Sequence, residues 1–246
     1  MKKTVKLMAL VMAIASILLL LTGCQERKQT LYKTVGSIVT FGKYEQDNNT
    51  GNGPEDIEWI VLDVQDGKSL LLSRYGLDVK PYNTERKDIT WEECSLRAWL
   101  NNDFLKSAFA QEEQSAILLT TVDNSQSQGY SNYDTNGGNN TQDYLFLLSY
   151  AEANKYLDVT RGDGNNTKSR VAPTAYAKAQ GVFTIVNNKT ADGEAAGWWW
   201  LRSPGRRQDC AANVSNIGSL NNGYGVDYEY AVVRPAFWLN LESDIF

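Results

Sequence analysis

The sequence predicts an α+β fold built from antiparallel sheets, a few short helices and long loops. Three observations predict it. Apolar runs typical of strands occur near both ends of the chain, signals for helix starts lie between them, and polar stretches rich in Asn, Ser, Thr and Gly separate the elements. These polar stretches are long and cover residues 123–140, 160–168 and 187–193.

Strand signals are clearest in the first third of the chain. Residues 36–44 alternate in the period-two pattern of a strand. Residues 57–64 and 68–74 are apolar and β-branched, and Asp66-Gly67 lies between them. Because Asp-Gly favours the tight turn of a hairpin, these two runs are expected to pair. Further strands are expected at 198–201 and 232–239.

The first helix signal follows the hairpin. Thr90 and Glu93 have the spacing of a capping box, in which each side chain bonds the backbone N–H of the other residue. This spacing predicts a helix over residues 91–100, and Asn101-Asn102 is expected to end it. Shorter helical turns are expected at 104–109 and 111–118.

Two further helices are predicted in the middle of the chain. Ser149 and Glu152 repeat the capping-box spacing and predict a helix that ends near Leu157. Pro173 near the start and Gly181 just past the end frame another helix over residues 174–180, because proline is favoured in a first turn and glycine after a last one.

The composition excludes several classes of function. The chain has 246 residues, 24 Lys and Arg, 29 Asp and Glu, and no histidine. Without histidine there is no Ser-His-Asp triad, no Cys-His pair and no histidine-ligated zinc, and neither a metal site nor another cofactor is predicted. The net charge of −5 argues against nucleic acid as a partner, because nucleic acid requires clustered Lys and Arg.

The N-terminal segment has the pattern of an export signal. Residues 1–6 carry three lysines, residues 7–21 are almost wholly apolar, and Leu21-Thr22-Gly23-Cys24 follows. The apolar run is shorter than the roughly 20 residues that span a bilayer, and it fits a secretory signal. Leu-Thr-Gly-Cys has the form of a bacterial lipobox, in which the Cys24 thiol is diacylated. An uncleaved N-terminal anchor helix is the alternative.

The lipobox divides the chain into three segments. Residues 1–23 are the predicted lipoprotein signal peptide, residues 24–33 the lipidated tether and residues 34–246 a single domain. Two acyl chains suffice for stable anchoring, so diacylglycerol on Cys24 is expected to hold the protein at the extracytoplasmic face of the cell membrane. Signal removal takes away three lysines and changes the net charge from −5 to −8.

Cys94 and Cys210 remain once Cys24 is lipidated. Two thiols are too few for a structural zinc site. Outside the cytoplasm the two are able to form a disulfide. Two separate buried thiols are the alternative, because spacing in the sequence says nothing about the distance between the two Cα atoms.

Four short motifs occur in order along the chain. They are Trp91-x-x-Cys94-x-x-Arg97-x-Trp99-Leu100-Asn101, Phe146-Leu147-Leu148-Ser149, Trp199-Trp200-Leu201-Arg202-Ser203-Pro204-Gly205 and Val233-Arg234-Pro235-Ala236. Together they resemble a large family of uncharacterised bacterial surface lipoproteins and cell-envelope proteins with an LRSPG…VRPA signature. The resemblance runs from about Gly36 to Leu241.

That family is similar to the C-type-lectin-like fold in its formylglycine-generating-enzyme variant. The resemblance implies that Arg202-Ser203 and Val233-Arg234 lie on neighbouring strands. The same fold carries the variable proteins of diversity-generating retroelements, in which the last stretch of the chain displays a ligand-binding face, so residues 206–230 are implied as that face. The copper-binding cysteine pair of the enzymes is not matched, because Cys210 is the only late cysteine, and their chemistry is not implied.

The composition of residues 206–230 resembles that of an antibody paratope. Tyr supplies contact area at a low entropic cost, Asn and Ser supply adaptable hydrogen bonds, and Arg supplies forked donors. A solvated β-meander, in which Gly and Asn serve the turns, is the alternative. The predicted ligand-binding residues are Arg206, Arg207, Asn213, Ser215, Asn216, Asn221, Asn222, Tyr224, Asp227, Tyr228 and Tyr230.

Other motif residues are predicted to be structural. Arg202 and Arg234 are able to bind an anionic ligand, but we favour buried arginines that pair with carboxylates or cap carbonyls and hold the C-terminal strands in register. Residues 198–200 are all Trp, and because strand residues alternate faces, at least one belongs to the core. Trp91, Arg97 and Trp199 complete the predicted structural set.

The predicted function is binding of an extracellular ligand, which is a glycan, an envelope polymer or a protein, by a membrane-anchored surface lipoprotein. A carboxylate-dependent enzyme acting on cell-wall or glycan substrates is the alternative, because a glycosidase carboxyl pair needs no histidine. Glu92, Glu93, Asp209 and Asp227 are among many candidates, and their spacing selects no pair. An assembly subunit without a small ligand is a third alternative.

Overall fold

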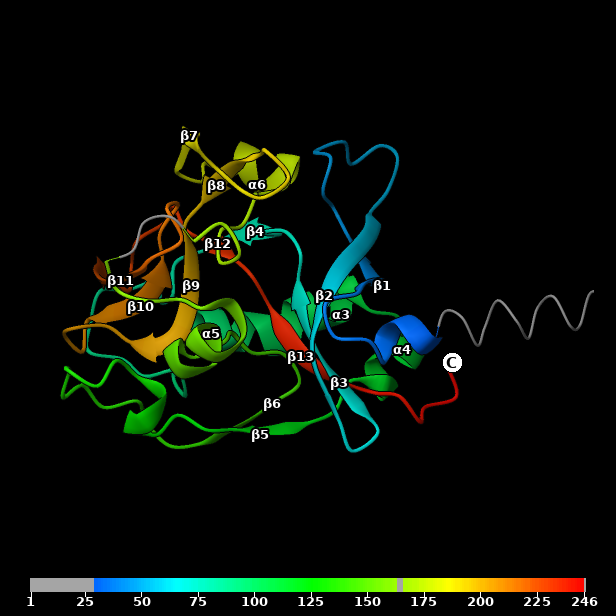
Figure 1. The fold of residues 1–246 in the computed structure, drawn as a ribbon, viewed down its shortest axis with the longest axis horizontal. Helices are drawn as coiled ribbons and strands as arrows, with labels where there is room; N and C mark the ends of the chain where they lie inside the picture. The colour runs from blue at the N-terminus through cyan, green and yellow to red at the C-terminus, as the bar shows by residue number, and fades with distance from the viewer. Residues whose placement is uncertain (1–28, 163–165, 246) are drawn as a thin grey trace, which may run out of the picture.

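The fold is mixed α/β, with curled and mostly antiparallel sheets and few helices (Figure 1). It is seen in a computed structural model that describes residues 29–162 and 166–245. The first sheet contains the earliest and the last strands of the chain. Its order is β1 (Ile38–Tyr44), β2 (Glu55–Gln65), β3 (Lys68–Ser73) and β13 (Ala236–Asn240), all antiparallel to their neighbours.

The second sheet is built mainly from the C-terminal part of the chain. Its order is β11 (Leu220–Gly225), β10 (Cys210–Val214), β9 (Trp199–Pro204), β12 (Val232–Val233) and β4 (Asp78–Val79). The β12–β9 pair is parallel and the others are antiparallel. Two small antiparallel pairs complete the strands, namely β5 (Thr120–Val122) with β6 (Thr141–Asp143), and β7 (Thr184–Lys189) with β8 (Ala195–Gly197).

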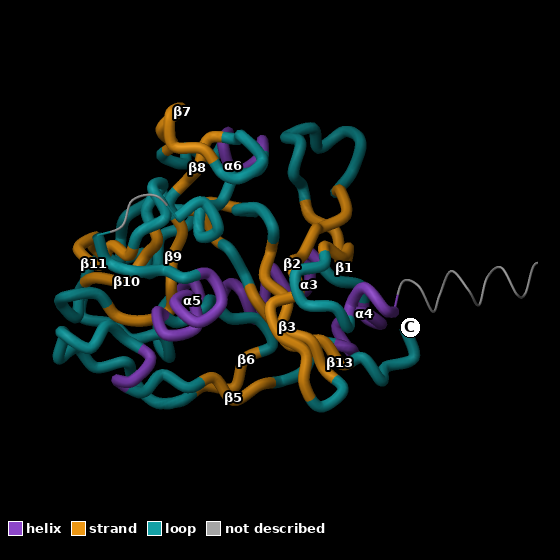
Figure 2. Tube along the Cα trace, viewed as in Figure 1, coloured by secondary structure: helices purple, strands orange, loops and turns teal. Residues whose placement is uncertain are grey.

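The helices are short and long loops connect them to the strands (Figure 2). They are α2 (Ser95–Trp99), a π-helical turn (Leu100–Phe104), α3 (Leu105–Ala108), α4 (Gln111–Ala116), a 3₁₀ turn (Gln126–Gln128), α5 (Tyr150–Leu157) and α6 (Ala175–Ala179). In the described residues no helix has the length and apolar character needed to cross a bilayer. The predicted signal peptide and the lipobox fall outside these residues.

Several elements predicted from local signals are confirmed. Asp66 and Gly67 have φ values of 48° and 70°, which is the turn geometry that matches the twist of the β2–β3 hairpin. Ser149 and Glu152 form the expected capping box at the start of α5. α6 is also present, but its cap is Thr174, so the preceding proline lies one position before the cap.

The predicted helix over 91–100 is wrong in both its start and its end. The helix begins at Ser95, because the Cys94 sulfur accepts the Arg97 amide and caps it there. Asn101 and Asn102 do not end it. Their side-chain amides donate to carbonyls one turn earlier, at 3.1 and 2.7 Å, and the chain continues as the π-helical turn and α3.

The core of the second sheet reaches both faces of β9. Trp199 and Trp200 are adjacent and therefore point to opposite faces, and both are fully buried. Trp199 donates to the Ser169 carbonyl at 2.9 Å, and Trp200 donates to the Lys80 carbonyl at the same distance. Trp198 is partly exposed. The sheet is therefore covered on both sides at this strand.

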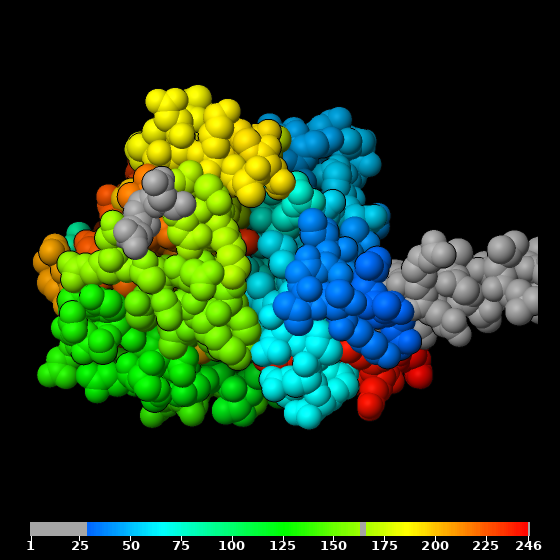
Figure 3. Space-filling model, viewed as in Figure 1, coloured from blue at the N-terminus to red at the C-terminus, as the bar shows by residue number. Residues whose placement is uncertain are grey.

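The chain is attached to the first sheet from the start of the described residues. Residues 29–32 form a helical turn beside the C-terminal residues, seen in blue and red at one end of the molecule (Figure 3). Tyr32 is 2% exposed, its hydroxyl donates to the Thr40 carbonyl, and Ser69 donates to its carbonyl. Residues 29–33 were predicted as tether, and this part of it is packed against the sheet.

Burial of Tyr32 predicts a loss of stability at alkaline pH. Burial, with a contribution from Glu113, raises its pKa from 10.0 to about 12. Because the neutral phenol is favoured in the folded state, its contribution is complete below pH 10 and is lost as the pH rises to 12. The loss is about 2–3 kcal/mol. In Tyr32→Phe the free energy of unfolding should therefore depend less on pH between pH 10 and 12. Urea titrations of both proteins at several pH values measure this free energy. Parallel curves for both proteins would contradict the assignment.

Candidate functional site

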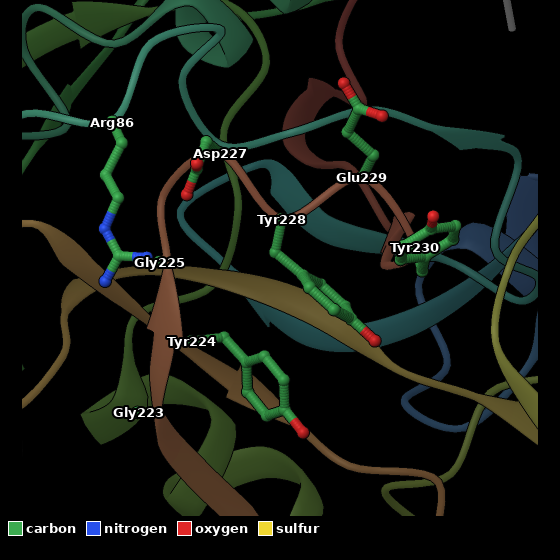
Figure 4. A pocket seen from close by; sticks show the side chains of 8 residues that line it. All are labelled: Arg86, Gly223, Tyr224, Gly225, Asp227, Tyr228, Glu229 and Tyr230. Carbon is green, nitrogen blue, oxygen red and sulfur yellow. The ribbon is translucent and has the colours of Figure 1, made fainter.

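A solvent-open pocket of about 550 Å³ lies at the C-terminal end of β11 (Figure 4). It is formed by the end of β11 and the segment that leads from it towards β12, with one side chain from the loop after β4. Its lining residues are Arg86, Gly223, Tyr224, Gly225, Asp227, Tyr228, Glu229 and Tyr230. Most of the lining thus comes from the last part of the predicted ligand-binding face.

Three tyrosines form the aromatic wall of the pocket. The ring centres of Tyr224 and Tyr228 are 4.6 Å apart, and those of Tyr228 and Tyr230 are 5.3 Å apart. Trp198, the residue before β9, supports them, with its ring centre 4.4 Å from that of Tyr224 in an edge-on arrangement. Aromatic packing of this kind fixes each ring and lowers the entropy lost when a ligand binds.

The hydroxyl groups of these tyrosines are free within the described part of the chain. None of the three donates to or accepts from a described residue. Figure 4 shows the rings of Tyr224 and Tyr228 side by side with their hydroxyls pointing the same way. Burial raises the pKa of Tyr228, and the neighbouring Tyr224 and Tyr230 raise it further, so this hydroxyl stays protonated and able to donate at neutral pH.

Charged groups lie at the other side of β11. Arg207 holds Asp209 with two bonds of 2.8 and 3.0 Å, and Arg86 bonds the same carboxylate at 3.1 Å. These arginines lower the pKa of Asp209 to about 2, with Arg207 as the larger influence, so the carboxylate is ionised at neutral pH. Arg206 is exposed, and its guanidinium makes no bond with a described residue.

Gly225 allows the side chains of Asp227 and Arg86 to approach β11. A Cβ atom at this position would lie 2.5 Å from the Asp227 carboxylate and 3.1 Å from the Arg86 guanidinium carbon. The first distance is far inside van der Waals contact, so a side chain here would displace Asp227 from the pocket. The glycine therefore sets the shape of the charged side of the pocket.

Part of the predicted ligand-binding face is buried, which corrects the sequence-based expectation. Tyr224, Asp227, Tyr228 and Tyr230 line the pocket, and Arg206 and Arg207 are exposed beside it. Asn221 is half-buried and accepts the Gly223 amide. Asn213, Ser215, Asn216 and Asn222 are only 1 to 7% exposed, so they do not meet a ligand from solvent.

The reason for this burial is the place of β10 in the sheet. β10 lies between β9 and β11, and every residue of it is buried. Ser215 bonds Ser219 across the turn that follows. Asn213 has neither side-chain polar atom bonded to a described residue, and the side-chain nitrogens of Asn216 and Asn222 are in the same state. Such groups usually bond buried water.

One lining side chain that matters could not be found by sequence reasoning. Arg86 lies in a short charged run, Glu85-Arg86-Lys87-Asp88, and is separated from Asp209 by more than a hundred residues. A charged run of this kind is usually a solvated loop, and its spacing carries no signal for a pocket. Only the fold brings it beside β11.

Residues 66–241 match a protein family described as Domain of unknown function (DUF6273). The chain belongs to this family. The match covers the pocket, the second sheet and most of the helices. Neither the curated proteins nor the solved structures contain a match to this sequence.

Arg202 of the DUF6273 domain is 2% exposed and bonds groups from several segments. Its guanidinium contacts both carboxylate oxygens of Glu152. It also donates to the Leu147 carbonyl at 2.9 Å, the Asp123 carbonyl at 2.9 Å and the Asn124 side chain at 3.2 Å. A guanidinium that is bonded so completely to the protein has little capacity left for a ligand.

Arg234 is also buried, at 1% exposure, but its bonding is incomplete. It donates to the Ser73 carbonyl at 2.9 Å, and its guanidinium lies 5.0 Å from the centre of the Trp199 ring. One terminal nitrogen has no partner among the described residues. Burial lowers its pKa to about 9, and the group still carries its charge at neutral pH.

The first family motif forms a buried polar network around Asp143. Trp91 donates to this carboxylate at 2.9 Å and Arg97 pairs with it at 2.6 Å.

Cys94 and Cys210 are free and buried, which agrees with two separate thiols rather than the disulfide. Burial raises the pKa of Cys94 to about 12, so this thiol is not a nucleophile at neutral pH.

A group of three carboxylates lies between the end of β1 and the start of β2. Glu45, Asp47 and Glu55 bring carboxylate oxygens within 4.8 Å of one another. These oxygens accept nearby amides, including those of Gln46 and Asn49. The bonds account for the position of the carboxylates, and the group is separate from the pocket residues.

A structural role for Arg202 predicts a large loss of stability on substitution. Arg202→Met would leave the Glu152 carboxylate without its cationic partner and two carbonyls without the guanidinium donor, which should cost about 3–5 kcal/mol. Arg206→Met is the matched control, because Arg206 is exposed and unbonded, and its cost should stay within about 0.5 kcal/mol. Urea unfolding measures both. Equal costs for the two substitutions would contradict the structural role.

Proposed function

We propose that this DUF6273 protein binds a glycan of the cell envelope or the extracellular surroundings through the tyrosine-lined pocket. One observation carries the proposal: three packed tyrosines line the pocket, and their hydroxyls have no partner among the described residues. Buried or fixed polar groups normally satisfy one another in a folded protein, so a row of free donors beside a cavity marks a surface suited to an external ligand.

The mixture of groups favours a sugar over a wholly apolar ligand. The C–H faces of pyranose rings pack against aromatic faces, and sugar hydroxyls bond to the kinds of group found here. Tyr224 and Tyr228 supply both an aromatic surface and hydroxyls, while Asp227 and Arg86 supply an acceptor and a forked donor. An envelope polymer with sugar repeats fits the same chemistry.

A C-type-lectin-like fold of the formylglycine-generating-enzyme variant belongs to this proposal. Two observations support it. The sheets are curled and mostly antiparallel with few helices, and β9, which carries Arg202-Ser203, pairs at Trp199 with β12, which leads into Arg234. The implied arrangement of the two motifs on neighbouring strands is the one seen here. In the variable proteins that share that fold, the last stretch of the chain displays a ligand-binding face, and residues 223–230 of this chain line the pocket.

Location at the extracytoplasmic face of the membrane is the second part of the proposal. It rests on the Leu21-Thr22-Gly23-Cys24 lipobox and the apolar run before it. A diacylated Cys24 would hold the domain at the cell surface, where glycans and envelope polymers occur.

Substitution of the tyrosines tests the ligand. Tyr230→Ala removes contact area, and Tyr224→Phe with Tyr228→Phe removes only hydroxyls. Each change should weaken binding about tenfold or more, because tyrosines at the centre of a site carry much of the binding energy. An oligosaccharide array followed by calorimetry measures it. Tyr144→Ala, another partly exposed tyrosine that does not line the pocket, should leave binding unchanged.

The outcome of the same array separates the alternatives. Binding to no sugar, or equal loss with Tyr144→Ala, would contradict the glycan proposal.

A carboxylate-dependent hydrolase has one observation in its favour, since Asp227 and Glu229 both line the pocket. Conversion of a bound oligosaccharide into shorter products would support that alternative. Exchange of residues 206–230 for a flexible loop is no test, because it would delete the buried strand β10.

Substitution of the lipidated cysteine tests the location. Cys24→Ser removes the thiol that carries the lipid, so the protein should leave the membrane fraction or keep its signal peptide. Metabolic labelling with a fatty acid, together with cell fractionation, measures both effects. A variant that is still processed and labelled would show that Cys24 is not the lipidated residue.

A further inference from the structure

The described chain begins very close to the proposed lipid anchor. Residues 29–32 form a helical turn against the first sheet. Tyr32 holds it by its bond to the Thr40 carbonyl, and the Gln29 side chain donates to the Leu241 carbonyl at 3.3 Å. Between Cys24 and Gln29 there are four residues. A chain of this length spans at most about 18 Å between the two Cα atoms, even when fully extended. The end of the domain that carries residue 29 therefore stays close to the lipid.

This end exposes apolar side chains. Leu31 is 45% exposed, Val35 is 61% exposed and Ile38 is 44% exposed. All three lie within fourteen residues of Cys24, and exposed Lys33 lies between the first two. Apolar side chains flanked by a lysine are suited to the boundary between lipid headgroups and acyl chains, where the ammonium remains in water.

We propose that the end of the domain formed by residues 29–38 rests on the membrane, with Leu31 and Val35 in the headgroup region. The proposal rests on the lipid anchor at Cys24. The occupant of this apolar surface is lipid because the tether is too short to hold the surface far from the bilayer. α4 and the C-terminal residues carry four carboxylates, namely Glu112, Glu113, Glu242 and Asp244. The contact is therefore attributed to the lipid anchor and the apolar side chains and not to attraction by anionic lipid.

The consequence concerns the direction in which the pocket points. Residues 29–38 and the C-terminus lie at one end of the long axis of the molecule, and β10 and β11 lie at the other (Figures 1 and 3). With the first end on the membrane, β11, whose end lines the tyrosine pocket, lies in the part of the domain away from the bilayer. The ligand is then a glycan presented from outside rather than a group of the membrane beneath.

Depth-sensitive labelling tests the orientation. The diacylated full-length protein, isolated from membranes, is placed in phosphatidylcholine vesicles with a fluorophore at Val35→Cys. Val186→Cys, on β7, is the matched control, because it is also an exposed valine, at 73%. The native Cys94 and Cys210 are 1% exposed, so labelling of the unsubstituted protein gives the background.

The label at position 35 should be quenched about twofold or more strongly by spin-labelled lipid than the label at position 186. Iodide in the water should quench the label at 186 more strongly. Equal quenching at both positions, in protein that floats with the vesicles, would overturn the orientation while leaving the anchor intact. Protein that fails to float with the vesicles would overturn the anchor, and the orientation with it.

Discussion

The contact between Arg202 and Glu152 is the interaction on which the second sheet and its surroundings depend. Glu152 completes the capping box of α5 by accepting the Ser149 amide, and the same carboxylate receives the guanidinium of Arg202 on β9. The remaining donors of Arg202 hold the Leu147 carbonyl and the loop after β5. Burying a charge is costly unless it is paired and hydrogen-bonded, and the acceptors of Arg202 come from several segments that meet at β9.

The position of β9 decides what the rest of the C-terminal chain is able to do. Trp199 and Trp200 fill both of its faces, so neighbouring β10 is enclosed as well. β11 is the strand beyond β10, and the end of β11 and the segment that follows line the pocket. The polar groups of the pocket are thus those that the sheet leaves exposed. Tyr224, Tyr228 and Tyr230 remain reachable from solvent, while Asn213 on β10 and Asn222 on β11 are buried.

Local signals predicted the elements that local physics controls. The Asp66-Gly67 hairpin, the Ser149 capping box and the helix capped by Thr174 depend on backbone geometry within a few residues, and each is present. The helix expected over 91–100 shows the limit of such signals. Thr90 has the spacing of a cap, but Cys94 takes that role once Trp91 and Arg97 are held by Asp143, which lies about fifty residues away in the chain.

By itself, the sequence determined the mixed class of short helices and mostly antiparallel strands, the order of the four motifs, the absence of histidine chemistry and the stretch that supplies most of the pocket lining. Period-two patterns, caps and composition are local properties, and they predict an element correctly where tertiary contacts do not override them. Only the tertiary structure decided which residues of 206–230 reach solvent, brought Arg86 beside Asp209, and left Cys94 and Cys210 apart. These outcomes depend on which strand lies inside the sheet and which at its edge, and that order is fixed by contacts between residues far apart in the chain.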